Sequence, residues 1–206
     1  MQSLTKSDFI TFKYSDCGEM LPYERYKLYN WVKDFKFKSV LEIGTGSGAS
    51  TYFIAQALKE NGEGTIMTCD PERVPPNDLL NDYDNIRFFK VTSDVLIDKI
   101  IEKNKKLDYI FFDGPEIPNL ALDDLAKLED YIEIGCYFSM HDWEYTQRPY
   151  DNGTSNKASM IRPYIENSDR WEKVEILSGL TVNSDYYIFE ESNTDSVGFC
   201  LYRFVK

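Results

Sequence analysis

The sequence of 206 residues lacks the features that mark several classes of protein. No run of about 20 apolar residues is present, so a helix that crosses a bilayer is not expected. The first twelve residues lack the basic and then apolar order of a signal peptide. The four cysteines are far apart and form no Cys-x-x-Cys pair, and Cys69 and Cys136 lie in apolar runs, which favours buried reduced thiols. We therefore expect a soluble, cytoplasmic protein.

Positive charge is also scarce. The chain has 23 Lys and Arg against 35 Asp and Glu, and its formal net charge is −12. A protein that binds the phosphate backbone normally presents a basic face, so a nucleic-acid partner is not expected. An anionic membrane surface is disfavoured for the same reason. The charge balance therefore disfavours both nucleic acid and anionic membranes as main partners.

The chain has the length of one large domain, on a scale of about 100–200 residues per domain, so residues 1–206 are expected to form a single domain. Short apolar runs alternate with segments of helical period, which favours an α/β, doubly wound, mainly parallel sheet. The expected strands are 40–43, 65–69, 86–91, 109–112 and 136–140, and the expected helices between them are 49–60, 94–103 and 120–132.

The ends of this alternating region carry further elements. Residues 1–38 are expected to form an N-terminal helical cap, with a helix over 23–35. The polar segment 144–158 is expected to be a lid loop that leads into a helix over 156–166. The cluster Pro75–Asp78 predicts a loop, and Asn119 is placed to cap the helix that follows it. Three closing strands are expected, at 174–177, 186–190 and 198–205, with the last two in antiparallel pairing.

The strongest motif is a glycine-rich turn after the first expected strand. The apolar run 40–43 leads into the alternating glycines Gly44, Gly46 and Gly48, and a helical segment follows at once. Glycine permits a tight strand-to-helix turn and lets a ligand approach the backbone closely. Asp70 ends the second expected strand, where an acid bonds ribose hydroxyls in dinucleotide-binding sheets. The motif predicts a nucleotide-like cofactor above this turn.

The run from Glu42 to Gly48 resembles the first motif of class I S-adenosylmethionine-dependent methyltransferases, in which an acid precedes alternating glycines. Four motifs follow the order of that family, over about residues 20–143. The resemblance implies a Rossmann-like sheet with an antiparallel closing strand, and methyl transfer from S-adenosylmethionine to a small-molecule acceptor at a hydroxyl oxygen. The cofactor-binding residues that it implies are Glu42, Gly44, Thr45, Gly46, Gly48, Ser50, Asp70, Ser93, Asp94 and Asp113.

The resemblance also implies a role for the main positions. Glu42 would face the methionine part of the cofactor, and Asp70 would bind its ribose. Ser93 and Asp94, at the start of the helix after the third strand, match positions that contact the adenine. Asp113 matches the motif after the fourth strand, near the sulfonium.

Two other functions stay open. Gly44-x-Gly46-x-x-Ala49 also fits the looser fingerprint of a nicotinamide-dependent oxidoreductase. However, that fingerprint does not require the acid before the first glycine, and the chain has no room for a separate catalytic domain. The pair Tyr23 and Lys27 precedes the glycine turn, on the wrong side for a short-chain dehydrogenase. The other alternative is a non-catalytic protein of the same fold that only binds the cofactor.

The one histidine of the chain, His141, follows the fifth expected strand and is next to Asp142. Asp113 follows the fourth expected strand, and open α/β sheets bind ligands at this carboxyl edge. We therefore expect Asp113, His141 and Asp142 to meet there as catalytic residues.

The spacing of these three residues resembles the metal site of catechol-type O-methyltransferases, and antibiotic-tailoring methyltransferases also use acid pairs there. The resemblance implies a divalent cation, Mg²⁺ or Mn²⁺, held by Asp113, His141 and Asp142. An imidazole ligand shifts the preference from Mg²⁺ towards Mn²⁺, Fe²⁺ or Zn²⁺. Alternatively, His141 is a general base that Asp142 orients. The lysine base of the catechol-type enzymes has no evident counterpart near these positions.

Two further features surround this constellation. Many small-molecule members have Asp-Gly-x-His after the fourth strand, whereas this chain has Asp-Gly-Pro-Glu116. Glu116 is either a ligand or base in that position or a solvated side chain. Trp143, Tyr145 and Tyr150 border the expected lid loop and are candidates to wall an aromatic or sugar-like acceptor.

Overall fold

The computed structural model describes residues 4–11, 13–14, 20–143, 156–177 and 198–206. Within these ranges, no helix has the length and apolar character needed to cross a membrane. The helices are α1 (Lys6–Ile10), α2 (Pro22–Asp34), α3 (Ala49–Asn61), α4 (Asn77–Asp82), α5 (Ser93–Glu102), α6 (Pro118–Glu129) and α7 (Ala158–Glu166). The strands are β1 (Ser39–Ile43), β2 (Thr65–Cys69), β3 (Ile86–Phe89), β4 (Tyr109–Phe112), β5 (Tyr137–Met140), β6 (Trp171–Leu177) and β7 (Phe199–Phe204).

The strands form one sheet in the order β3-β2-β1-β4-β5-β7-β6. The first five of these pair in parallel, and β7 is antiparallel to both β5 and β6. The strand order reverses between β1 and β4, which is where an open α/β sheet forms a crevice at its carboxyl edge. The predicted Rossmann-like sheet with an antiparallel closing strand is confirmed.

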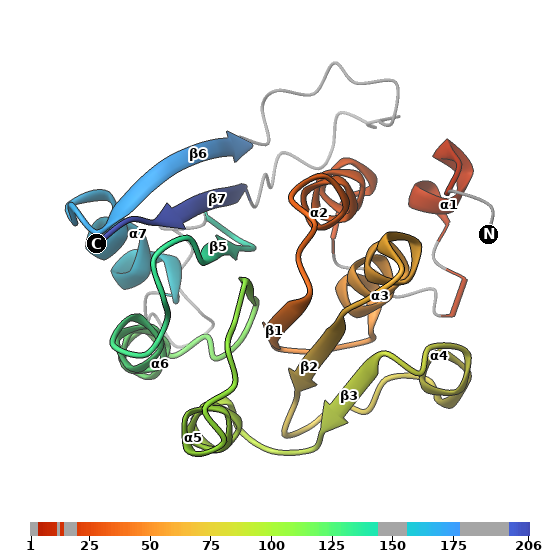
Figure 1. Ribbon diagram of the computed structural model, residues 1–206, viewed down its shortest axis with the longest axis horizontal. Helices are drawn as coiled ribbons and strands as arrows, with labels where there is room; N and C mark the ends of the chain where they lie inside the picture. Colours follow the sequence, from red (N-terminus) through yellow and green to blue (C-terminus); the bar gives the residue numbers. More distant parts are fainter. Residues whose placement is uncertain (1–3, 12, 15–19, 144–155, 178–197) are drawn as a thin grey trace.

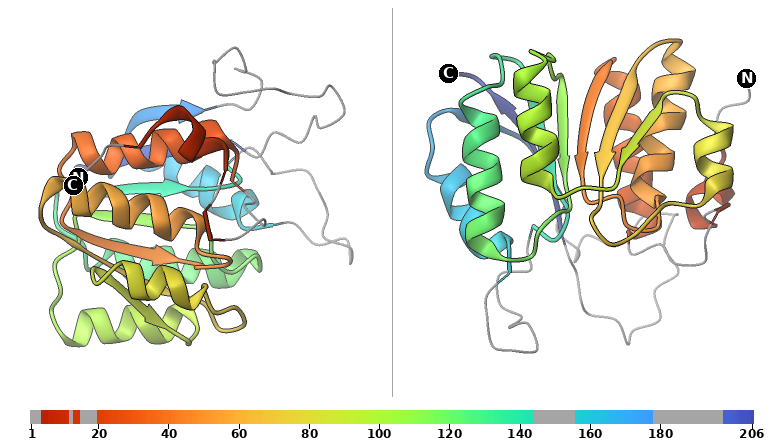
Figure 2. Two further views of the ribbon diagram at one scale, coloured as in Figure 1. Left: turned by 90° about the vertical axis from the view of Figure 1, so that its right-hand side faces the viewer. Right: turned by 90° about the horizontal axis from the view of Figure 1, so that it is seen from below.

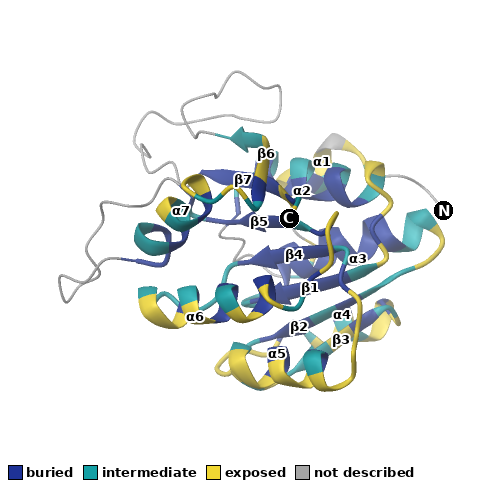
Figure 3. Ribbon diagram, turned by 60° about the vertical axis from the view of Figure 1, so that its left-hand side comes forward, coloured by how far each residue is buried: buried dark blue, intermediate teal, exposed yellow. Residues whose placement is uncertain are grey.

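Helices cover both faces of the sheet (Figures 1 and 2), with α2 and α3 on one side and α5 and α6 on the other. Side chains along β4 alternate between the two faces, as the period of a strand requires. Tyr109 and Phe111 pack in the cluster under α2 and α3, whereas Ile110 and Phe112 pack in the cluster under α5 and α6. The central strands are therefore buried on both faces, while the outer sides of α5 and α6 are exposed (Figure 3).

Several sequence predictions differ from the structure near element ends. Asn77 and Asp78 do not continue a loop; they begin α4, because Pro76 precedes the helix as its N-cap and an acid suits the first turn. Helix α6 begins at Pro118, so the predicted cap at Asn119 is wrong. Proline is favoured at the first helical position because its fixed φ matches a helix and its missing N–H is not needed there.

Both ends of the chain contain elements that the sequence predicted only in outline. Within residues 1–38, α2 matches the predicted helix, and α1 was not predicted. The predicted strand 186–190 lies outside the described residues. Most of the predicted lid loop, residues 144–155 with Tyr145 and Tyr150, also lies outside them. Cys69, Cys136 and Cys200 are buried free thiols, as the sequence predicts for the first two.

Candidate functional site

The glycine-rich turn joins β1 to α3 at the carboxyl edge of the sheet. The backbone N–H groups of Gly44 and Thr45 donate to the carbonyl of Cys69, which ties the turn to the end of β2. Gly44 has a φ of +91°, and a Cβ there would lie 1.9 Å from the carbonyl oxygen of Asp113. Gly46 has a φ of +54°, but the nearest heavy atom to its Cβ position is the Nη1 of Arg73, 3.9 Å away. Gly44 is therefore required by packing, whereas the space beside Gly46 is open to a ligand.

Asp70 connects this turn to the loop after β2. Its Oδ2 accepts a hydrogen bond from the backbone N–H of Gly46 at 2.9 Å. Its Oδ1 accepts from the N–H groups of Glu72 and Arg73, at 2.9 and 2.7 Å. These bonds fix the carboxylate of Asp70, a residue that lines both cavities beside the turn.

Glu42 supports the turn from below. Its side chain is completely buried, and the hydroxyls of Ser50 and Thr51 donate to its two carboxyl oxygens, each at 2.5 Å. Burial raises the pKa of Glu42 to about 7, although these two hydrogen bonds oppose the rise. Glu42 thus joins β1 to the first turn of α3, and among the described residues it lines neither of the two cavities. The contact of Glu42 with the methionine part of a cofactor stays a prediction.

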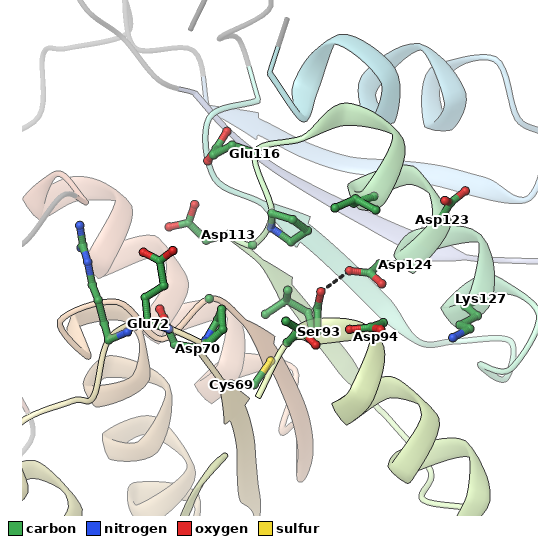
Figure 4. Close-up of a pocket in the computed structure, with 18 residues that line it drawn as sticks. Cys69, Asp70, Glu72, Ser93, Asp94, Asp113, Glu116, Asp123, Asp124 and Lys127 are labelled. Carbon is green, nitrogen blue, oxygen red and sulfur yellow. Dashed lines mark hydrogen bonds between the residues drawn. The ribbon is translucent and has the colours of Figure 1, made fainter. Parts of the chain in front are cut away.

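A cavity of about 860 Å³ lies beside the turn, between the ends of β2, β4 and the helices α5 and α6. Figure 4 shows Asp70 and Glu72 on one side of it and Ser93, Asp94 and Asp124 on the other. The Ser93 hydroxyl donates a hydrogen bond to Asp124. Burial raises the pKa of Asp124 to about 6, against the lowering effect of that bond.

A second cavity of about 230 Å³ adjoins the first over the glycine turn. Met20, Ser50 and Asp142 are among its lining residues, so the N-terminal segment and the end of β5 both contribute to it. The two cavities share the lining residues Gly44, Asp70, Arg73, Asp113, Gly114 and Glu116. Together they form a path along the carboxyl edge, with Asp113 at the junction.

The three residues predicted to converge at this edge do meet. The Nδ1 of His141 lies 3.3 Å from the Oδ1 of Asp142 and 3.6 Å from the Oδ2 of Asp113. This follows from the register, since His141 and Asp113 continue the neighbouring strands β5 and β4. Asp142 has a φ of +64°, an uncommon backbone conformation that Asp tolerates better than most residues.

The other ring nitrogen of His141 faces a residue that the sequence did not single out. Its Nε2 lies 3.1 Å from the Oε2 of Glu24, in the first turn of α2. Burial lowers the pKa of His141, but the carboxylates of Glu24 and Asp113 outweigh it and raise the pKa well above its usual value. An imidazolium between three carboxylates has no lone pair for an incoming proton. The arrangement does not fit the predicted role of His141 as a general base.

Lys157, directly before α7, is the second residue that the sequence did not single out. Its side chain is completely buried, and its Nζ lies 3.1 Å from Asp113 Oδ1, 2.6 Å from Glu116 Oε1 and 2.8 Å from Asp142 Oδ2. Burial lowers the pKa of Lys157, but these carboxylates raise it above its usual range. Glu116 is thus an ion-pair partner rather than an isolated solvated side chain. The prediction that no lysine lies near these acids is wrong.

Trp143 does not take the predicted place at an acceptor. Its side chain is completely buried, and its ring centroid lies 5.3 Å from that of Tyr202 on β7. It belongs to the apolar cluster under α6 and α7. A large aromatic side chain contributes most to stability in such a position.

The described residues fit a resident divalent cation poorly, although one ligand atom each of Asp113, His141 and Asp142 lies within 4.8 Å of the others. Lys157 already places a positive charge against the two carboxylates of this set. Both nitrogens of His141 face carboxylates, whereas a metal ligand must offer a free lone pair. The predicted metal at these residues stays a prediction.

Comparisons with known proteins agree with this geometry. A family model described as "Methyltransferase domain" matches residues 41–143, which is half of the chain. That range runs from β1 to the end of β5 and contains the glycine turn, Asp70, Asp113 and Asp142. No curated protein sequence matches the chain significantly.

Solved structures share the fold at low sequence identity. An O-methyltransferase from Bacillus cereus in complex with S-adenosylhomocysteine matches with a TM-score of 0.67 and 17% identity, over 98% of this chain and 87% of that one. The O-methyltransferase TomG from Streptomyces achromogenes, in complex with S-adenosylmethionine, matches with a TM-score of 0.64 and 13% identity, over 97% of this chain and 86% of that one. The Podospora anserina methyltransferase PaMTH1, bound to S-adenosylhomocysteine, matches with a TM-score of 0.65 and 14% identity, over 91% of this chain and 80% of that one. The family match and the fold agree with the resemblance seen in the glycine turn, and the chain belongs to the methyltransferase domain family.

Proposed function

We propose that this methyltransferase moves a methyl group from S-adenosylmethionine to a hydroxyl oxygen of a small molecule. The observation that carries the proposal is the path formed by the two adjoining cavities, which crosses the glycine turn and reaches a cluster of buried charges. The solved structures of the same fold that hold S-adenosylmethionine or S-adenosylhomocysteine support this choice of cofactor. The net charge of −12 supports a small-molecule acceptor over nucleic acid. The free thiols of Cys69, Cys136 and Cys200 support a cytoplasmic location.

The larger cavity fits the nucleoside part of this cofactor. Ser93 and Asp94 at the start of α5 would face the adenine, and Asp70 would accept hydrogen bonds from the ribose hydroxyls. The open backbone at Gly46 and the side chain of Ser50 line the smaller cavity, where the methionine part would lie. When bound, the cofactor supplies an electrophilic methyl group on a sulfonium. Asp113, at the junction, offers it a negative charge.

The acceptor end is formed by charged side chains of the chain itself. Glu116 and Asp142 both line the smaller cavity. We infer that Glu116 accepts the hydrogen bond of the acceptor hydroxyl and takes its proton as the oxygen gains the methyl group. Burial alone would raise the pKa of Asp142, but its ion pairs with His141 and Lys157 hold that pKa well below its usual range, so Asp142 is a poor base. His141 and Lys157 hold these acids in place through their ion pairs. Orientation of this kind contributes up to ~7–11 kcal/mol in well-aligned systems.

The alternatives are less well supported. The family match over residues 41–143 does not favour a nicotinamide-dependent oxidoreductase. A protein that only binds the cofactor would have no need of the ion-paired acids beside it. Fully buried charges are costly to maintain unless they are paired, and such groups concentrate at functional sites.

Methyl transfer can be measured directly with methyl-labelled S-adenosylmethionine and a panel of catechols, other phenols and sugar-like alcohols. We expect label to enter at least one hydroxyl compound and not its analogue in which that oxygen is already methylated. The Glu116→Gln variant should lose turnover by about 10²-fold or more. The control Asp84→Asn changes an exposed acid before β3 and should retain activity. Label found in no acceptor, with the cofactor bound, would favour the non-catalytic alternative.

A further inference from the structure

The carboxylates at the acceptor end surround a cation that belongs to the chain. The two acids of the predicted metal set, Asp113 and Asp142, each place an oxygen within 3.1 Å of the Nζ of Lys157. A third carboxylate, that of Glu116, lies 2.6 Å from the same nitrogen. Three contacts match the three N–H donors of an ammonium group. The Nζ therefore has the surroundings that an oxygen-binding cation would need.

The position of Lys157 in the chain makes this arrangement unusual. It directly precedes α7, and the N-terminus of a helix carries partial positive charge, which disfavours a lysine there. Its side chain is nevertheless completely buried. Burial of an ammonium group is costly unless it is paired. The carboxylates of Asp113, Glu116 and Asp142 must supply the compensation.

We propose that Lys157 is the resident cation of this site and occupies the place that a divalent ion would take between Asp113 and Asp142. The transferase would then hold its acids in position without a metal, and removal of the Lys157 side chain would turn the same acids into a metal site. The metal-binding part of this proposal is independent of the proposed methyl transfer. The expected effect on turnover rests on the proposed methyl transfer.

The test is a titration of Mn²⁺ followed by electron paramagnetic resonance, on protein first stripped with chelator and then freed of it. Wild-type protein should leave the signal of free Mn²⁺ unchanged. Lys157→Ala should bind Mn²⁺ with an affinity higher by about ten-fold or more, the scale on which changes around a metal site alter affinity. The control Lys106→Ala removes an exposed lysine that pairs with Glu133, and it should behave as wild type.

A double variant, Lys157→Ala with Asp142→Asn, should lose the new binding, because it removes one of the acids. Mn²⁺ bound by the wild type as tightly as by Lys157→Ala would overturn the proposal. So would a folded Lys157→Ala protein that binds no Mn²⁺. If Lys157→Ala does not fold, Lys157→Met preserves the bulk of the side chain without its charge and is judged by the same criterion. If neither variant folds, the wild-type titration decides, and Mn²⁺ binding there contradicts the proposal while its absence supports it.

Measurements of turnover test the place of Lys157 in a second way. With an acceptor in hand, wild-type activity should be the same with and without chelator, and chelator should abolish whatever activity Mn²⁺ restores to Lys157→Ala. Wild-type activity lost on chelation and restored by Mg²⁺ or Mn²⁺ would overturn the proposal. If methyl transfer itself fails, the Mn²⁺ titration still tests the place of Lys157 independently.

Discussion

The Nε2 atom of His141 lies 3.1 Å from the Oε2 atom of Glu24, although 117 residues separate them in the chain. The same carboxyl oxygen of Glu24 accepts a hydrogen bond from the backbone N–H of Leu21, at 2.9 Å. Glu24 therefore caps helix α2 and also pairs with the buried histidine at the end of β5. Through this pair helix α2 holds one side of the charged cluster.

Glu24→Gln should lower stability because it leaves the charge of the buried imidazole without a carboxylate on one side. A hydrogen bond to a charged group contributes about 1.5–3 kcal/mol, and we expect a loss of that size in urea unfolding. Glu63→Gln is the matched control, since Glu63 pairs with Lys38 on the surface, where such a pair is worth about 0–1 kcal/mol. Equal losses in the two variants would show that the pair of Glu24 and His141 contributes nothing.

Stability should also fall as pH rises towards neutrality, through Glu42. Its pKa in the folded protein is about 7, against an ordinary value of 4.5, so the folded state favours the protonated form. The protonated carboxyl of Glu42 contributes its full stabilisation below the ordinary pKa. This contribution is lost as pH rises through the pKa that Glu42 has in the folded protein. A shift of this size corresponds to about 3 kcal/mol.

Glu42→Gln places a neutral amide at this position and should remove most of that slope. Urea unfolding at a series of pH values between about 5 and 8 measures the difference between the two proteins. Asp124, whose pKa is raised to about 6, contributes the same decline in stability to wild type and variant, so its effect cancels in the comparison. Parallel curves for wild type and variant would contradict the assignment of a raised pKa to Glu42.

Two glycines of the turn should respond differently to the same substitution. Gly44→Ala would bring a Cβ to 1.9 Å from the carbonyl oxygen of Asp113, so we expect misfolding or a loss of several kcal/mol, about 3 or more. Gly46→Ala meets no heavy atom closer than 3.9 Å and should cost only about 1–2 kcal/mol for its positive φ. It should nevertheless weaken cofactor binding, because its methyl group enters the smaller cavity.

Thermal unfolding and calorimetry with S-adenosylhomocysteine separate the two effects. A folded Gly46→Ala protein with wild-type affinity would mean that the cofactor does not pass close to this turn. A Gly44→Ala protein as stable as the wild type would contradict the close approach of the backbones of β1 and β4.

The sequence predicts the fold well because its signals are local. Runs such as 40–43 and 109–112 are continuous apolar segments of strand length, and the glycines between β1 and α3 mark the turn. Asp113 and His141 could be placed together because parallel strands bring their carboxyl ends to one edge. The predicted loop at Pro75–Asp78 was wrong in its second half because a proline can precede a helix as well as break one.

Lys157 and Glu24 could not be placed in this way, because no strand register fixes them. Glu24 follows Pro22 at a position that an acid often takes as a helix cap, so it gives no separate signal. Lys157 does give a weak signal in the sequence. A lysine directly before the apolar residues of a helix opposes the helix dipole and calls for an acidic partner elsewhere.

The proposed function depends above all on S-adenosylmethionine binding along the path over the glycine turn, and calorimetry with its product S-adenosylhomocysteine measures that binding. We predict a dissociation constant in the micromolar range, about −8 kcal/mol, with NAD giving no binding heat. Asp70→Ala should weaken that binding by about 1.5–3 kcal/mol, because the ribose loses its carboxyl hydrogen-bond partner. Tight binding of NAD together with no binding of S-adenosylhomocysteine would contradict the proposed cofactor and, with it, the proposed methyl transfer.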